Sequence, residues 1–272
     1  MNRPTLDNPT GGVRPEIRTI YTMLTGRGDT YRSAAATVLS DGVRSLGIPL
    51  TPHQVESFAQ LAEMLVEANS QFNLTRIIQP EDVMRRHFLD SLTTLPHIRA
   101  SGDSSMLVAD VGTGGGLPGL ALAIVRPAWR FVLIESITKK ARFVEQAAAT
   151  LGLTNVEVLA ERAEVLAQGR LRDTFDIVVA RAVAPTGVLL EYCCPLVRSG
   201  GTVLLHKSGQ QAEESAEARR VARELGAGAV AVHPVATELG LGGDRFILEV
   251  AKTGPTPGGF PRRVGLARSL PL

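Results

Sequence analysis

Residues 106–119 read MLVADVGTGGGLPG, an apolar run that passes into an acid, a glycine-rich turn and the start of a helical pattern. Glycine reaches positive φ without strain and lets a ligand approach the backbone closely. The first turn of the following helix presents N–H groups that no helical carbonyl uses. The stretch therefore predicts a site for a nucleotide-type cofactor at the end of a strand.

The residues around these glycines indicate which cofactor is bound. Gly114, Gly116 and Gly119 satisfy the G-x-G-x-x-G spacing that holds a pyrophosphate in dinucleotide sites. Asp110, however, would place a carboxylate beside that pyrophosphate, and Pro118 removes an N–H donor. S-adenosylmethionine carries a sulfonium and an ammonium but no phosphate, so an acid at the strand end attracts it. The turn thus favours S-adenosylmethionine over NAD.

A second acid follows the next predicted strand. Residues 130–135 read RFVLIE, and Glu135 lies 19 residues beyond Gly116. That spacing suits a carboxylate that accepts the ribose hydroxyls of an adenosine, in NAD as well as in S-adenosylmethionine. An ordinary tight turn is the alternative for the glycines alone, but strand, acid, turn, helix, strand and acid in succession favour a cofactor site.

Strand and helix patterns alternate from residue 104 to residue 252. The expected strands are 106–111, 130–135, 156–159, 175–180, 201–206, 229–235 and 245–250. Helical patterns separate them at 118–126, 139–151, 185–197 and 211–225. This alternation predicts an α/β fold with a doubly wound, mostly parallel, seven-stranded sheet, and ligands then bind at the carboxyl ends of the strands.

The flanks differ from this Rossmann-like domain. Residues 33–103 show helical periodicity and form a predicted helical appendage. Residues 1–32 are rich in Pro, Gly, Thr and Arg and lack any period, so we expect a disordered extension. Residues 253–272 form a basic tail whose prolines and glycines favour extended chain over helix.

The charge distribution bears on the partner. The net charge of +2 says little, but from Lys252 onward the chain has four basic residues and no acid. The other three are Arg262, Arg263 and Arg268. This tail either contacts RNA or is a solvated charged segment.

Composition also bounds location and assembly. The chain shows no secretory signal pattern and no apolar run of about 20 residues, so we expect a cytoplasmic protein without membrane contact. Cys193 and Cys194 are adjacent in an apolar stretch, which is typical of packing residues and not of a metal site. We expect a monomer that binds no metal.

Charged residues mark the ends of the later strands. Arg181 ends the fourth predicted strand, where a buried guanidinium needs a carboxylate or a ligand. Glu164 follows the third strand and indicates either an adenine-side contact or an acid in the first turn of a helix. Lys139 lies in the first turn of a predicted helix, and Lys207 follows the fifth strand. Each lysine either faces solvent or holds RNA phosphate.

Several segments together resemble one family over residues 50–250. They are Asn73-Leu74-Thr75, Arg86-His87-Phe88-Leu89-Asp90-Ser91, the stretch from Asp110 to Gly119, and Ala180-Arg181-Ala182-Val183-Ala184. These segments resemble the bacterial small-subunit ribosomal RNA guanine N7-methyltransferases, also called glucose-inhibited division protein B. The tail segment Phe260-Pro261-Arg262-Arg263 is similar to the longer members, whereas His206-Lys207-Ser208-Gly209 departs from the commoner apolar-Lys-Gly.

The resemblance implies a fold, a reaction and a set of residues. The fold is that of class I S-adenosylmethionine-dependent methyltransferases, and the reaction is methyl transfer to N7 of a guanine in the 530 loop of 16S rRNA, free or in the small ribosomal subunit. Guanine N7 bears no proton, so no general base is needed, and Arg181 and Asp110 are supporting residues only. The residues implied for the cofactor pocket are Gly112, Leu117, Ala163, Glu164 and Arg181. The RNA-side candidates are His87, Lys139, Arg162, Lys207, Arg262 and Arg263.

Two other function classes stay open on the sequence: an NAD-linked oxidoreductase and a noncatalytic RNA-binding or ribosome-assembly factor. Binding of S-adenosylhomocysteine against NADH separates the first from a methyltransferase. Transfer of labelled methyl to ribosomal RNA separates the second.

Overall fold

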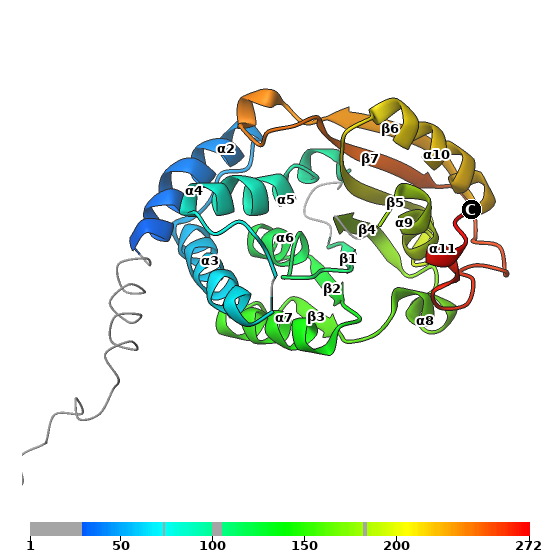
Figure 1. Ribbon diagram of the computed structural model, residues 1–272, viewed down its shortest axis with the longest axis horizontal. Coiled ribbons are helices and arrows are strands. Elements are labelled where there is room, and N and C mark those ends of the chain that lie inside the picture. The colour runs from blue at the N-terminus through cyan, green and yellow to red at the C-terminus, as the bar shows by residue number, and fades with distance from the viewer. Residues whose placement is uncertain (1–28, 73, 100–104, 182–183) are drawn as a thin grey trace, which may run out of the picture.

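The computed structural model describes residues 29–72, 74–99, 105–181 and 184–272 (Figure 1). Its centre is one seven-stranded sheet in the order β3-β2-β1-β4-β5-β7-β6. The strands are β1 (Leu107–Val111), β2 (Arg130–Ile134), β3 (Val156–Leu159), β4 (Phe175–Arg181), β5 (Val197–Ser208), β6 (Ala227–Pro234) and β7 (Arg245–Lys252). The predicted doubly wound, mostly parallel sheet is confirmed.

The β7 strand is the exception to the parallel arrangement. It runs antiparallel to both β5 and β6, whereas every other neighbouring pair is parallel. A parallel neighbour needs a long crossover connection, usually a helix, and the chain between β6 and β7 holds only the one-turn helix η4 (Thr237–Leu239). The short connection therefore dictates the antiparallel pairing.

Helices cover both faces of the sheet. They are α6 (Gly119–Val125), α7 (Thr138–Thr150), α8 (Ala163–Gln168), α9 (Thr186–Cys193) and α10 (Gln211–Glu224). Side chains alternate between the faces along each strand: Val108 belongs to the core shared with α6 and α7, and Ala109 to the core shared with α8, α9 and α10. The carboxyl ends of β1, β2 and β4 come together between these layers.

The N-terminal helices pack on the α6 face, at the left of Figure 1. The elements are η1 (Ala35–Leu39), α2 (Ser40–Ser45), α3 (Pro52–Phe72), α4 (Pro80–Val83), η2 (Met84–Leu89), α5 (Asp90–Leu92) and η3 (Leu95–His97). The rings of Phe58 and Phe88 pack against each other at an interplanar angle of 46° within one hydrophobic cluster that also contains Leu120 of α6. The helical segment and the sheet therefore share a core.

The two chain ends differ from expectation. Residues 29–32, which we assigned to a disordered extension, are helical, and residues 1–28 lie outside the described part. After β7 the chain packs against α8 and α9 and forms a short helix, α11 (Leu266–Ser269), shown in red in Figure 1. Side-chain hydrogen bonds from the domain to the tail backbone fix this conformation, which the local sequence did not indicate.

Across the described residues, every helix is too short or too polar to span a lipid bilayer.

Candidate active site

The glycine-rich turn after β1 adopts the conformation that its sequence predicts. Gly112, Gly114 and Gly116 have φ of 71°, 60° and 85°, values that favour glycine. Gly119 is needed for a different reason. A Cβ there would lie 2.1 Å from Leu133 Cδ2 and 2.8 Å from Asp110 Oδ2, so only glycine lets α6 begin this close to the sheet.

Asp110 lies beneath the turn and not on a cavity wall. Its side chain is fully buried, and its Oδ2 accepts hydrogen bonds from Thr113 Oγ1 (2.6 Å) and the Gly119 N–H (2.8 Å). Burial raises the pKa of this carboxyl to about 6. Asp110 therefore holds the turn against the start of α6. Its place at the strand end had predicted instead a carboxylate that faces the cofactor.

Glu135 closes the turn from the neighbouring strand. Its Oε2 accepts the Gly114 N–H at 3.0 Å and its Oε1 accepts the Ile137 N–H at 2.8 Å. An amide that already donates to a carboxylate is a poor site for a pyrophosphate, so the turn does not suit a dinucleotide. Each Glu135 oxygen keeps a second lone pair, and the side chain lines a wide cavity of about 770 Å³.

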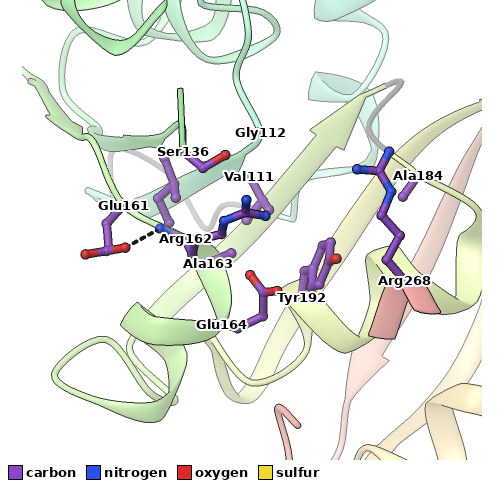
Figure 2. A pocket seen from close by; sticks show the side chains of 11 residues that line it. Val111, Gly112, Ser136, Glu161, Arg162, Ala163, Glu164, Ala184, Tyr192 and Arg268 are labelled. Carbon is purple, nitrogen blue, oxygen red and sulfur yellow. Dashed lines mark hydrogen bonds between the residues drawn. The ribbon is translucent and has the colours of Figure 1, made fainter. Parts of the chain in front are cut away.

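A narrow cavity adjoins the wide one at Gly112, Ser136, Ala184 and Arg268, which line both. Figure 2 shows Glu161, Arg162, Ala163, Glu164 and Tyr192 around it. Glu164 is buried, and its Oε1 accepts the N–H of Gly265 from the C-terminal tail at 3.2 Å. The residues after β3 thus meet those after β1 in one pocket, as the family resemblance implies.

Most of the cofactor candidates come together at these two cavities. Those that line them are Gly112, Gly114, Leu117, Glu135, Ala163, Glu164 and Arg181. Asp110 and Gly116 do not; they shape the turn from behind. Asn73, Ala182 and Val183, quoted above for the resemblance, lie outside the described residues.

Arg181 has the carboxylate partner that its position at a strand end demands. Its Nη1 lies 3.0 Å from Asp90 Oδ2, and the other oxygen of Asp90 pairs with Arg245 of β7 at 2.8 Å. Burial opposes ionisation of Asp90, but nearby groups that include both guanidinium groups lower its pKa below the usual range. His206 adds a hydrogen bond from Nε2 to the Asp90 carbonyl at 3.0 Å. One residue of the N-terminal helices thus joins β4, β5 and β7 beside the wide cavity.

Comparison with known proteins identifies the family. The model of the family "rRNA small subunit methyltransferase G" (GidB) matches residues 54–239. This chain belongs to that family. Proteins named "Ribosomal RNA small subunit methyltransferase G" are 41% identical over 246 residues in Deinococcus radiodurans (90% of this chain, 95% of the relative) and 39% identical over 236 residues in Roseiflexus sp. strain RS-1 (86% and 99%). The solved structure of a SAM dependent methyltransferase from Aquifex aeolicus aligns with a TM-score of 0.47 and 18% identity, over 62% of this chain and 92% of that one.

Membership of the methyltransferase G family confirms the resemblance drawn from the sequence motifs. The hydrogen bond between Gly114 and Glu135 points the same way, because it occupies an amide that a dinucleotide would need. The alternative function of an NAD-linked oxidoreductase is therefore rejected.

The RNA-side candidates of this methyltransferase G chain lie in different places. His87 lines the wide cavity with its Nε2 2.7 Å from Thr75 Oγ1, and burial lowers the pKa of its imidazole to about 4. Lys207 also lines that cavity, but its Nζ pairs with Glu214 at 3.0 Å. Arg162 stands at the narrow cavity. Lys139 lines a separate groove between α3 and α7.

The two tail arginines behave differently from the prediction that both contact RNA. Arg262 donates from its backbone N, Nε and Nη2 to Glu191, whose side chain is 1% exposed. The Arg262 side chain is therefore engaged by Glu191 inside the protein and is not a free surface cation. Arg263 is exposed and lines neither cavity.

Sequence reasoning missed several residues of the site. Asp90 and Arg245 lie 155 positions apart and pair only through the fold. Tyr192 is an ordinary helix residue in sequence terms, and Thr75 was quoted only as part of a motif of the family resemblance, without a role in the site. Arg268 was visible only as one more basic residue of the tail, although it borders both cavities.

Proposed function

We propose that this methyltransferase G chain transfers the methyl group of S-adenosylmethionine to N7 of a guanine in the 530 loop of 16S rRNA. The observation that carries the cofactor assignment is the hydrogen bond between the Gly114 N–H and Glu135 Oε2, in a chain that matches the family model over residues 54–239. Because this hydrogen bond occupies the Gly114 amide, the turn suits a cofactor with an adenosyl group and no phosphates.

The residues that would hold this cofactor follow from the cavities. Glu135 offers a lone pair on each oxygen to the ribose hydroxyls. Ala163 and Glu164 line the narrow cavity on the adenine side, and Gly112 and Leu117 line the wall next to the turn. When bound, the cofactor supplies an electrophilic methyl on a positively charged sulfur.

The reaction requires the protein to align guanine N7 with the methyl carbon and the sulfur. The N7 lone pair forms the new bond to carbon, the carbon–sulfur bond breaks, and its electron pair stays on sulfur. Positive charge thereby moves to the guanine ring and no proton is removed. Asp90 lies between two arginines, and Asp110 lies under the turn. Neither carboxylate is placed as a base, in keeping with a reaction that depends on alignment.

The wide cavity is the proposed guanine site. Arg181 and His87 line it, and Arg181 is fixed by Asp90 and by the His87 carbonyl at 3.1 Å. Fixed donors orient a base without reorganising when it enters.

The partner and location follow from the substrate. We propose the cytoplasm, where ribosomal RNA is made, and a monomer. In support of the monomer, the described ranges expose few large apolar side chains: Ile78, Ile137, Val165, Val264 and Leu270.

The test combines transfer with cofactor binding. Labelled methyl should pass to 16S rRNA, either free or in small subunits, and chemical cleavage at 7-methylguanosine should locate it in the 530 loop. Glu135→Gln should weaken S-adenosylhomocysteine binding by about 1.5–3 kcal/mol, as for hydrogen bonds to a charged group. Glu145→Gln, at an exposed position of α7, is the matched control and should bind as the wild type does. The proposal is contradicted if no labelled methyl reaches 16S rRNA, or if Glu135→Gln and Glu145→Gln bind S-adenosylhomocysteine with equal affinity.

A further inference from the structure

The C-terminal strap, residues 253–272, is anchored to the domain by buried groups. Lys252, with a fully buried side chain, pairs with Asp173 and donates to Thr256 Oγ1 at 2.7 Å. The Arg172 guanidinium donates to the carbonyls of Thr256 and Phe260, both at 2.6 Å. The strap therefore has a defined course, and of its basic residues Arg262 is engaged inside the protein, whereas Arg263 and Arg268 are exposed.

The second half of the strap runs to the cofactor pocket. Arg262 binds the buried Glu191 of α9, and three residues later the Gly265 N–H binds Glu164 at the narrow cavity. Helix α11 follows directly, with Ala267 2% exposed against the domain. These contacts fix the position of Arg268.

Arg268 stands where the two cavities join. It lines both of them, together with Gly112, Ser136 and Ala184. Figure 2 shows its side chain rising from α11, with the guanidinium beside Ala184 and away from Glu164. The side chain is exposed, and it makes no hydrogen bond or ion pair with the rest of the described chain.

Arg162 brings a second guanidinium to the narrow cavity. Its side chain also lines the narrow cavity, is exposed, and pairs with none of the acids in the described ranges. The two nearby acids are otherwise engaged: Glu161 accepts the Arg162 backbone N–H and Glu164 accepts that of Gly265. Both arginines line the narrow cavity with exposed side chains and form no ion pair among the described residues, so their guanidinium groups are available to an anion.

We propose that Arg268, with Arg162, binds a backbone phosphate of the RNA next to the target nucleotide. This inference rests on the proposed function. A base that enters a cavity for chemistry leaves its stack, and its own phosphates then lie at the opening. The arginine guanidinium binds phosphate through two parallel N–H donors, and such contacts position nucleic acid without reading sequence.

The cofactor is a poorer match for these two arginines. Its sulfonium and ammonium are positive, and its ribose hydroxyls have a carboxylate acceptor in Glu135. Both arginine side chains are exposed to solvent. RNA phosphate therefore satisfies them better than the bound cofactor does.

The experiment measures binding of an RNA fragment that spans the 530 loop, with S-adenosylhomocysteine present, as a function of salt. Each phosphate contact contributes about 0.7 on single strands and 0.9 on duplex to the slope of log affinity against log salt. Arg268→Ala and Arg162→Ala should each reduce that slope by about 0.7–0.9, and the double variant by about twice as much. Arg268→Lys should keep the slope.

Arg263→Ala is the matched control, because Arg263 is an exposed arginine of the same strap that lines neither cavity. It should leave the slope unchanged. In transfer assays, Arg268→Ala should raise the KM for RNA more than it lowers kcat.

Three results overturn the proposal. One is a slope for Arg268→Ala equal to that of Arg263→Ala. Another is a loss of S-adenosylhomocysteine affinity in Arg268→Ala with an unchanged RNA slope, which would assign Arg268 to the cofactor. The third is absence of RNA binding by the wild type. Failure of methyl transfer with normal RNA binding would instead count against the proposed function alone.

Discussion

At the scale of single residues, Asp90 carries more of the site than any motif suggested. It holds Arg181 at 3.0 Å and Arg245 at 2.8 Å, with its own side chain only 4% exposed. Removing one partner of a buried ion pair costs about 3–5 kcal/mol, because the remaining charge has no compensation. Asp90→Asn should lower the unfolding free energy by about that amount, measured by urea denaturation.

A surface ion pair in the same segment provides the comparison. Asp82 lies 3.5 Å from Arg86, and both side chains are about half exposed. Asp82→Asn should cost less than about 1 kcal/mol, since solvent screens such pairs. Equal stability of the Asp82 and Asp90 variants would show that the Asp90 cluster contributes little.

His206, also a single residue, should make stability depend on pH. Burial lowers the pKa of its imidazole from the ordinary 6.5 to about 4. Between pH 6.5 and pH 4 this histidine is protonated in the unfolded chain but neutral in the folded chain. Its contribution to the unfolding free energy is therefore greatest above pH 6.5 and falls as the pH drops to 4. The loss amounts to about 3 kcal/mol. Asp110 acts in the opposite sense, because its raised pKa of about 6 makes stability fall as pH rises from 4 to 6.

His206→Gln removes this titration, and its amide nitrogen can still donate to the Asp90 carbonyl. Denaturation from pH 4 to 7 should therefore show a smaller acid loss than in the wild type, by about 3 kcal/mol. His53→Gln, at an exposed histidine of α3, should follow the wild-type curve. A curve for His206→Gln that matches the wild type would mean that His206 is charged in the folded protein.

At the scale of elements, one anchor of the strap is the ion pair between Arg262 and Glu191 of α9. Arg262→Ala leaves the Glu191 carboxylate buried without its partner, so we expect a loss of about 3–5 kcal/mol in urea denaturation. Arg263→Ala, next in the chain but exposed, should change stability by less than about 0.5 kcal/mol. The double variant Arg262→Met with Glu191→Met should recover most of the loss, since no charge is then left buried. Equal losses in the single and double variants would show that the strap is held elsewhere.

The strap also shows why an element can escape prediction. Its prolines and glycines predict extended chain, and they say nothing about Arg172 and Gln168, which fix its backbone from 84 to 93 positions away. The strands and helices around the glycine turn are different. Their patterns are local, and every strand and helix expected between residues 104 and 252 is found, although the structure adds helix α8, which was not among the expected helices.

At the scale of the whole molecule, the sequence by itself determined the sheet, the glycine turn and the family. Strand periodicity, positive-φ glycines and the acids at the ends of the first two strands are short-range signals, because backbone conformation and side-chain alternation depend on neighbours in the chain. The same signals indicated Glu135 and the residues after β3, which line the cavities as expected.

Only the tertiary structure decided which charges meet. It paired Asp90 with arginines 91 and 155 positions away, turned Asp110 under the glycine turn, engaged Arg262 with Glu191 and left Arg268 exposed at the opening. Ion pairs and burial depend on distances through space, and in this protein those distances are set by the packing of the N-terminal helices and the C-terminal strap on opposite sides of one sheet.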